Sequence, residues 1–353
     1  MKKIVILISI LLIFSCGGEV QIFNGEIVIV EQPATSDNLY GTELKLEGKL
    51  FRDGICVYDS LMLISADTLS AYRFCTYNIK TGKQIASVAR KGMGEDEFVA
   101  ASYSEQYSVD SSICLWLYDY EKVECSLVDL SDNSIQKHID LSVLENEREY
   151  PFGRVFILND SLLLAFSQGE DLYRNRNLSP PLYHIFNYKT NEELAKYEFY
   201  NGFRYSEKLN PQMCLYSQDR IKPDRSSLAM GMRYLRQINI MDVGTGKLTG
   251  YRVADTPDFN ILTKKSRKFA SYYLWICVDD SFIYGALNSK DEKSSTIDVF
   301  DWNGNFQKEL ILDKKMANIN SIALDPVNRC LYLLSDEKDE AKVFRYDVSY
   351  LYP

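Results

Sequence analysis

Two short motifs that recur about every fifty residues restrict the possible folds of this chain more than any other feature. The first is an acidic or amide residue next to Ser, followed by alternating apolar residues, as in Asp59-Ser60-Leu61. About 20 residues later, an aromatic or apolar residue precedes Asp or Asn and a polar turn. This second position is occupied by Asn78, Asp129, Asn187, Asp242, Asp301 and Asp347. The steps of 51, 58, 55, 59 and 46 residues are typical of the blades of a β-propeller.

The six repeats predict short antiparallel strands joined by tight turns. Clusters of the Asp-Ser and Asn-Gly type provide the side-chain hydrogen bonds and left-handed backbone that hairpin turns need. The flanking alternation of apolar residues buries one face of each strand. Four such strands form a sheet that cannot cover its own apolar faces, whereas six sheets around an axis cover one another. We therefore predict an all-β fold, a six-bladed β-propeller of four-stranded antiparallel blades over residues 41–353.

The ends of the repeat region indicate how the ring closes. The last repeat stops at residues 346–353, which leaves little room for a fourth strand. Residues 44–51 precede the first repeat and alternate like a strand. We expect this N-terminal strand to complete the last blade, so that deletion of residues 41–51 destabilises the whole domain. A seven-bladed ring is the alternative.

The beginning of the chain indicates export. A basic start precedes an apolar run over residues 4–14, which suits a secretory signal peptide and is too short for a permanent membrane span. Residues 13–16, which end in Cys16, resemble the lipobox of bacterial lipoproteins. This resemblance implies a lipid on Cys16 and an anchored position in the bacterial cell envelope, for which we favour the outer membrane. An ordinary signal peptide with a bystander cysteine is the alternative.

These features divide the chain into three parts. Residues 1–15 are the predicted signal peptide, residues 16–40 a lipidated N-terminus and tether, and residues 41–353 the propeller. The Gly, Pro and Ser content of the second part is typical of a linker. Its apolar patch, residues 27–30, is a candidate extra strand on the propeller surface.

One connection between repeats carries a local resemblance. Residues 90–98 resemble the Gly-x-Gly-Pro-Gly-Glu-Phe signature of six-bladed propeller lipoproteins of Bacteroidetes, which are related in fold to NHL and TolB-like propellers. The matching residues are Gly92, Gly94, Glu97 and Phe98. Glu95 and Asp96 stand where the signature has Pro and Gly. The resemblance implies a lipid-tethered propeller without an established set of catalytic residues. We interpret the match as structural, with Phe98 as a plug between blades and Glu97 as an acceptor for loop amides.

Charge makes nucleic acid an improbable partner. The chain has a net charge of −9, and removal of Lys2 and Lys3 with the signal peptide would make it −11. A protein with this excess of carboxylates repels a phosphate backbone. The predicted partners are therefore the membrane, through the N-terminal lipid, and a protein, peptide or glycan.

The cysteines indicate buried thiols. Seven remain after Cys16, an odd number without a Cys-x-x-Cys pair, and most lie among apolar residues. This pattern fits neither a zinc site nor a disulfide framework. Cys114 and Cys125 are one candidate disulfide, since they would suit neighbouring strands of a hairpin.

No catalytic site is recognisable in the sequence. The two histidines, His138 and His184, lie in different repeats, and neither has a neighbour in sequence that suggests a metal site or a Ser-His-Asp triad. Asp301 begins a stretch similar to a calcium loop, but Gly304 comes too early and we interpret the stretch as a turn. We predict no catalytic residue, metal ligand or cofactor. The alternative is a metal-dependent hydrolase or lyase with carboxylates of several blades holding calcium in the channel.

Two segments, residues 168–181 and 200–225, lengthen the repeats that contain them. Long loops on a rigid scaffold often carry recognition, and Tyr and Arg supply stacking surface and forked hydrogen bonding. The candidate binding residues are Tyr173, Arg174, Arg176, Phe203, Arg204 and Tyr205, accompanied by Tyr216, Arg220 and Lys222. We therefore favour a non-catalytic binding or scaffold module, with solvated decoration between blades as the alternative for both segments.

Overall fold

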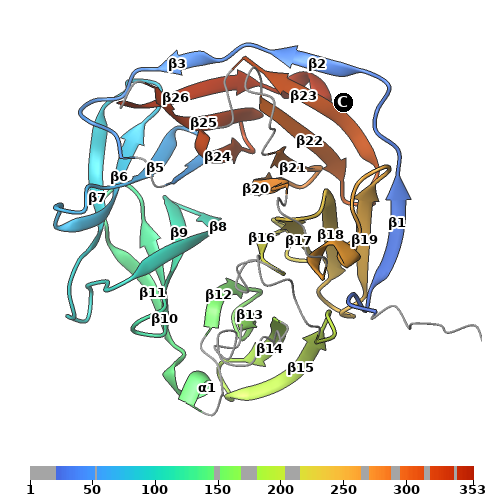
Figure 1. Cartoon of the computed structure of the whole chain (residues 1–353). Helices are drawn as coiled ribbons and strands as arrows, with labels where there is room; N and C mark the ends of the chain where they lie inside the picture. Colours follow the sequence, from blue (N-terminus) through green and yellow to red (C-terminus); the bar gives the residue numbers. More distant parts are fainter. Residues whose placement is uncertain are drawn as a thin grey trace, which may run out of the picture.

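The chain folds into a ring of six β-sheets around a central axis (Figure 1). The computed structural model describes residues 21–51, 54–146, 152–167, 181–202, 215–263, 270–287, 295–313, 319–337 and 340–353. Each sheet contains four neighbouring antiparallel strands, so the prediction of a six-bladed β-propeller is confirmed and the seven-bladed alternative is wrong.

The first three blades follow the chain from the axis outward. Blade one contains β4 (Ile55–Tyr58), β5 (Leu61–Ser65), β6 (Tyr72–Asn78) and β7 (Gln84–Arg90). Blade two contains β8 (Ala101–Val109), β9 (Ile113–Asp119), β10 (Glu124–Asp129) and β11 (Ile135–Asp140). Blade three contains β12 (Phe152–Ile157), β13 (Leu162–Ser167), β14 (Leu182–Asn187) and β15 (Glu192–Glu198).

The last three blades also take strands from the beginning of the chain. Blade four contains β16 (Ser217–Ile221), β17 (Ser227–Met232), β18 (Gln237–Asp242), β19 (Leu248–Val253) and β1 (Glu26–Val30). Blade five contains β20 (Tyr273–Val278), β21 (Phe282–Leu287), β22 (Ser295–Asp301), β23 (Phe306–Leu312) and β2 (Ser36–Leu39). Blade six contains β24 (Ile319–Asp325), β25 (Cys330–Glu337), β26 (Glu340–Asp347) and β3 (Thr42–Leu44).

The recurring Asp and Asn residues act as the turn formers expected from the repeats. Asn78 Oδ1 accepts hydrogen bonds from the backbone N–H of Lys80 and Thr81, at 3.0 and 3.1 Å. Gly82 then takes a φ of +72°, a left-handed conformation that favours glycine. Asp301 accepts in the same way from the N–H of Asn303, at 2.9 Å. The stretch that resembles a calcium loop is therefore a hairpin turn in the structure.

The N-terminal segment forms a strap along the outside of the ring. Strands β1 and β2 pair in parallel with β19 and β23, and β3 pairs antiparallel with β26. Figure 1 shows this strap in blue along the edge of blades four, five and six. The patch at residues 27–30 thus belongs to a surface strand, and the segment expected as a tether is packed on the ring from Gln21 onward.

A strand from the N-terminal side completes blade six, as expected. It lies at Thr42–Leu44 rather than at residues 44–51. The chain leaves the sheet after Leu44 because it must cross to the axis, where β4 begins blade one at Ile55. In this crossing, the N–H of Glu47 donates to the carbonyl of Gly82 at 2.7 Å, which fixes the segment against blade one.

The core is divided among the junctions between blades. Each of six buried apolar clusters joins two neighbouring blades, as the cluster around Phe98 joins blades one and two. In the described part of the chain, helical structure is limited to short segments at the edges: α1 (Ser142–Asn146) and the 3₁₀ segments Phe259–Leu262 and Ser349–Leu351. Among the described residues, no helix has the length and apolar character needed to cross a bilayer.

The described cysteines after Cys16 are free thiols. Cys114 and Cys125 do lie on neighbouring strands, β9 and β10, but the disulfide considered for them does not form. The register pairs Cys114 with Asp129 and Cys125 with Tyr118, so the two thiols are not opposite each other. Cys214 lies outside the described residues.

Candidate functional site

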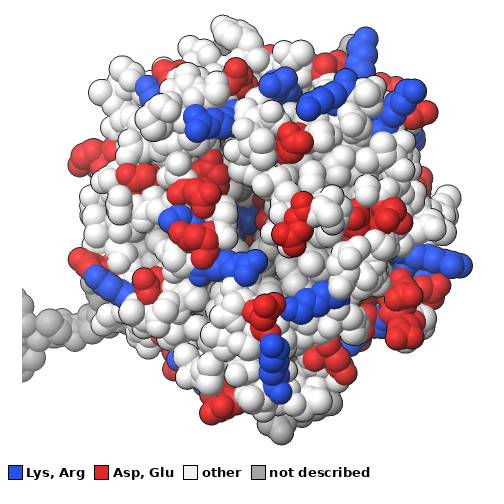
Figure 2. Space-filling view, turned by 180° about the vertical axis from the view of Figure 1, so that it is seen from behind, with Lys and Arg blue, Asp and Glu red and all other residues white. Residues whose placement is uncertain are grey.

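The ring has two different faces. We call the hairpin face the one that carries the turn from the first to the second strand of each blade and from the third to the fourth, such as residues 79–83. The loop face carries the connections from the second to the third strand and from each blade to the next, such as residues 66–71. Figure 2 shows the ring from behind, with acidic and basic side chains mixed over the face around a central hollow.

Both lengthened segments start from the loop face. The segment at residues 168–181 connects β13 to β14, and the one after Tyr200 connects β15 to β16. The candidate binding residues Tyr173, Arg174, Arg176, Phe203, Arg204 and Tyr205 lie outside the described residues. The predicted bounds of the second segment, residues 200–225, were too wide, since Ser217–Ile221 is the inner strand of blade four.

One cavity opens on the loop face at the axis. It has a volume of about 430 Å³ and is bounded by the inner strands β8, β12, β16 and β20 of blades two to five and, in blade one, by β5, β6 and the loop between them. Its polar and aromatic lining includes Ser65, Thr68, Arg73, Phe74, Lys91, Ser102, Tyr103, Ser104, Tyr118, Arg154, Tyr216, Gln218, Asp219, Arg220 and Trp275. We call this space the axial cavity. Tyr216 and Arg220, expected in a surface loop, are part of its wall.

A second cavity opens at the opposite end of the axis, on the hairpin face. It has a volume of about 290 Å³ and is lined by Tyr58, Tyr107, Val109, Lys222, Asp280 and neighbouring residues. Ser104 and Arg220 line both cavities, so these residues lie at the partition between them. Lys222, a candidate binding residue, forms an ion pair with Asp224 at 2.8 Å on this side.

An ion pair forms the partition. Arg220 Nη2 on β16 lies 2.7 Å from Glu105 Oε1 on β8, and both side chains are 12% exposed. A bulge in strand β8 places Glu105 next to Arg220 of blade four. Glu105 has a φ of +57°, and the pairing of β8 with β9 shifts between Tyr103 and Tyr107. A left-handed φ is costly for Glu and is often found where a side chain must be aimed at a functional site.

The neighbouring residues are arranged to hold this bulge. The amide of Gln106 donates to the carbonyl of Ile157 and accepts from its N–H, both at 2.8 Å, so the bulge is fixed to blade three. Burial raises the pKa of Glu105, although Arg220 opposes this effect. Burial also raises the pKa of the thiols of Cys56 and Cys277, which therefore stay neutral beside the ion pair.

A second ion pair supports the wall of the axial cavity. Arg154 Nη1 lies 2.7 Å from Asp219 Oδ2 and donates to the carbonyl of Ser217 at 2.9 Å. The guanidinium also lies 5.4 Å from the ring centres of both Phe166 and Tyr216. Asp219 is fully buried, so the pair joins blades three and four while Arg154 keeps one side toward the cavity.

The motif at residues 92–98 lies at the rim between blades one and two. Glu97 Oε2 accepts from the N–H of Gly94 at 3.0 Å, and a Cβ on Gly92 would lie only 1.9 Å from the same oxygen. Phe98 is 1% exposed within the cluster between the two blades. These contacts are those of a structural loop.

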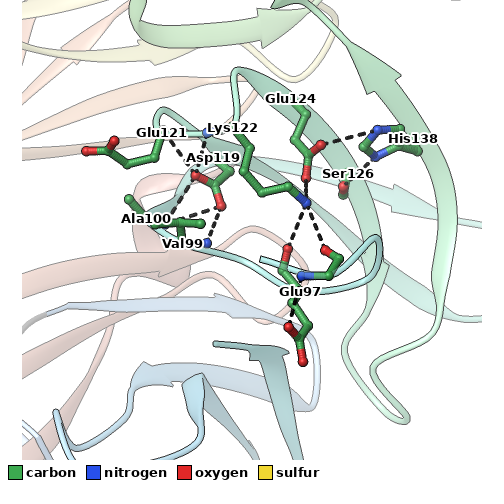
Figure 3. A network of polar contacts seen from close by, with 10 residues as sticks. Glu97, Val99, Ala100, Asp119, Glu121, Lys122, Glu124, Ser126 and His138 are labelled. Carbon is green, nitrogen blue, oxygen red and sulfur yellow. Dashed lines mark hydrogen bonds and ion pairs between the residues drawn. The ribbon is translucent and has the colours of Figure 1, made fainter. Parts of the chain in front are cut away.

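Blade two anchors this loop through the network in Figure 3. The buried carboxylate of Asp119 accepts from the N–H of Val99 at 2.6 Å and of Ala100 at 3.1 Å. Lys122 Nζ donates to the carbonyl of Glu97 at 3.0 Å and pairs with Glu124 at 2.5 Å. The rim next to the axial cavity is therefore rigidly tied to the scaffold.

The histidines have polar partners that the sequence did not suggest. His184 Nε2 lies 3.0 Å from Ser167 Oγ, and its Nδ1 lies 3.0 Å from Glu193 Oε1. This arrangement resembles a Ser-His-acid triad, but Ser167 and His184 are each 3% exposed. They line neither the axial cavity nor the cavity on the hairpin face. The arrangement acts in the structure as a chain of hydrogen bonds across blade three. His138 lies 3.3 Å from Ser126 Oγ and 3.4 Å from Glu124.

The described residues contain no group of three or more His, Cys, Asp or Glu side chains that could hold a metal ion. At the partition, the carboxylate of Glu105 faces the guanidinium of Arg220 rather than a second carboxylate. The axial cavity offers cationic, aromatic and hydroxyl groups around an open space, and groups of this kind suit the binding of a polar ligand.

Comparison with known proteins supports the fold. A protein of Bacteroides fragilis, described as exported, is 13% identical with a TM-score of 0.56, over 91% of this chain and 98% of its own. A DUF4221 family member of Bacteroides vulgatus is 11% identical with a TM-score of 0.55, over 89% and 96%. No family model and no curated protein matches the chain. At these identities, the similarity establishes the class of protein, a six-bladed β-propeller, and no activity.

Proposed function

We propose that this protein is a lipid-anchored, extracytoplasmic binding module of the outer membrane that takes a ligand in the axial cavity without catalysing a reaction. The ligand would be part of a protein, peptide or glycan. The observation that carries this proposal is the axial cavity, whose volume of about 430 Å³ lies within the usual range for ligand sites. It opens on the face from which both lengthened segments start.

Three observations support the cellular location and the family relationship in this proposal. Residues 13–16 resemble a lipobox, and residues 92–98 resemble the signature of Bacteroidetes propeller lipoproteins related to NHL and TolB-like propellers. Two proteins of Bacteroides share the fold, and one of them is described as exported. Since Ile22 and Phe23 are buried in the ring, residues 17–21 alone would separate a lipid on Cys16 from the propeller. Five residues span at most about 18 Å.

Filling the axial cavity should abolish ligand binding. Ser102 on β8 is exposed inside the cavity, so the substitution Ser102→Trp would occupy the space without disturbing the core. Val109→Trp on the same strand is the matched control, because Val109 is 48% exposed at the opposite mouth. Arrays of glycans and peptides probed with labelled wild-type protein and both variants provide the measurement.

Array members that bind wild type and Val109→Trp, but not Ser102→Trp, would support the proposal. Equal binding by all three proteins would show that recognition lies elsewhere. Turnover of a bound array member, detected as release of a product, would instead contradict a non-catalytic role.

Replacing Cys16 with Ala should release the protein from the membrane. The thiol of this residue is the acceptor of the diacylglycerol in a lipobox, so the variant should lose fatty-acid label and move to the soluble fraction. Cys75→Ala, which removes a half-buried thiol of blade one, is the control and should keep both label and location. Membrane location and label that survive Cys16→Ala would refute the anchor.

A further inference from the structure

The axial cavity is cationic although the protein is acidic. Its lining includes the positive side chains of Arg73, Lys91, Arg154 and Arg220, against the single carboxylate of Asp219. The chain as a whole has a net charge of −9. A concentration of positive charge in a concave site of an acidic protein favours an anionic ligand.

Two of these cations are already neutralised by the protein. Arg154 pairs with Asp219, and Arg220 pairs with Glu105, each at 2.7 Å. These pairs form the floor and wall of the cavity and hold their side chains in place. A ligand anion that meets them encounters fixed N–H donors rather than mobile charges, which reduces the entropy lost on binding.

The other two cations lack a carboxylate partner among the described residues. Lys91 Nζ donates to the backbone carbonyls of Asp67 and Thr68, at 3.2 and 2.9 Å. Arg73 lies close by, because its strand β6 pairs with β7, which ends just before Lys91. The rim of the cavity therefore carries two positive charges that the described part of the protein does not neutralise.

Hydrogen-bond donors without a partner also favour an anionic ligand. In the described structure, the Nε atoms of Arg73 and Arg220 are buried and make no hydrogen bond. A buried donor without a partner costs free energy, and a ligand acceptor would relieve this cost only if the side chain moved, because neither atom is open to solvent. Guanidinium groups present their donors as planar forks that match the two oxygens of a carboxylate.

The remaining lining suits a sugar ring better than a peptide side chain. Tyr103, Tyr216 and Trp275 present half-buried aromatic rings, which provide flat surfaces for the apolar face of a ring. Between them stand Ser65, Ser102, Ser104, Thr68 and Gln218, whose hydroxyl and amide groups both donate and accept hydrogen bonds. Neutral groups of this kind match sugar hydroxyls, while the cations match an acidic substituent.

We propose that the axial cavity binds a sugar that carries a carboxylate, with Arg73 and Lys91 at the rim recognising the carboxylate and the aromatic side chains contacting the ring. This inference rests on the proposed binding function and specifies its ligand class. It assigns Arg73 and Lys91 a role in specificity, and it leaves the buried pairs of Arg154 and Arg220 as the fixed frame of the site.

Trigalacturonate and its methyl ester form a matched pair of probes, because esterification removes the charges and keeps the rings. We expect wild-type protein to bind the acid at least about tenfold more tightly than the ester, by calorimetry at low salt. Arg73→Gln and Lys91→Gln should each weaken binding of the acid by about tenfold or more. Lys83→Gln, an exposed position on the hairpin face, should leave it unchanged.

Equal affinity for acid and ester, or no binding of trigalacturonate, would overturn the inference. So would tighter binding of triglutamate, since the site would then recognise an acidic peptide. These failures are separable from failure of the proposed function. Binding of the ester or of a neutral glycan that Ser102→Trp abolishes would keep the cavity as the binding site and reject only the acidic sugar.

Discussion

Replacing Asp298 with Ala should lower the free energy of unfolding by about 3 kcal/mol, because it removes the bidentate partner of a largely buried cation at a blade junction and leaves Arg236 only its contact with Glu309 Oε2, at 2.9 Å. Asp298 on β22 is fully buried. Its carboxylate accepts from Arg236 Nε and Nη2 at 2.8 and 2.7 Å and from the hydroxyl of Tyr273 at 2.8 Å. Arg236 belongs to blade four and the other two residues to blade five, so the network joins the two blades.

Urea denaturation at neutral pH measures this effect. Asp160→Ala is the matched control, since Asp160 pairs with Lys137 at 2.9 Å while 93% of its side chain is exposed. An exposed pair of this kind contributes little to stability, because water and salt screen the two charges. If both variants lose the same stability, the Asp298 network does not hold the junction. The double substitution Asp298→Leu with Arg236→Met should recover much of the loss, because it removes both buried charges together.

Buried carboxylates recur at other junctions of the ring, and this feature was not predictable from the repeats. Asp119 fixes the loop between blades one and two, Asp219 joins blades three and four, and Asp325 accepts from the N–H of Asp59 at 3.0 Å between blades six and one. Asp119 lies outside both motifs, and Asp219 lies on a strand that the repeats did not identify. Asp325 begins a looser copy of the first motif, which predicts its turn contacts but not its contact with blade one. The partners come from other blades, so sequence spacing carries no information about the pairing.

The number of blades was predictable because the turns are local. Asn78 and Asp301 form their hydrogen bonds within four residues, so the chemistry of each turn can be recognised in the sequence alone. The alternation expected for each strand is not seen in the middle strands, such as β9 and β18, because neighbouring blades cover both of their faces. The local hydrogen bonds and the spacing of the motifs, rather than a period of two, were therefore sufficient for the number of blades.

The axial cavity was missed because one of the strands that line it, β16, is polar. Strand β16, Ser217–Ile221, has little apolar alternation, so it was interpreted as part of an insertion. A signal was available, since an inner strand directly precedes the first motif of a blade, as Ile55–Tyr58 precedes Asp59. A looser copy of the first motif begins at Asp224-Arg225-Ser226, and the same rule applied to it would have assigned Arg220 to the channel. The bulge that brings Glu105 to it depends on contacts with blade three and leaves no such signal.

The strap was only partly predictable, for a related reason. Strand β1 has an apolar patch, but β2 reads Ser-Asp-Asn-Leu and joins blade five through parallel backbone pairing. Backbone hydrogen bonds make no demand on side-chain type, so a polar segment can pair at an exposed edge without an apolar pattern. The strap covers the outer edges of blades four and five, which would otherwise be free to pair with another chain.

Phe23→Ala tests whether the strap stabilises the ring, and it should lower the free energy of unfolding by about 3–5 kcal/mol. Phe23 is 5% exposed and stacks on Phe259, with ring centres 5.3 Å apart and an angle of 13°. It also pairs with Tyr200 between blades three and four. The substitution leaves a cavity where the beginning of the strap enters the core.

Ile29→Ala is the control within the same strap, because Ile29 is 51% exposed and its truncation removes little buried surface. Thermal and urea unfolding of both variants, in the Cys16→Ala background, give the comparison. Equal small losses would mean that the strap lies on the ring without contributing to its stability. A large loss for Phe23→Ala alone would mean that residues close after Cys16 belong to the core, so that the proposed anchor and the fold depend on the same short segment.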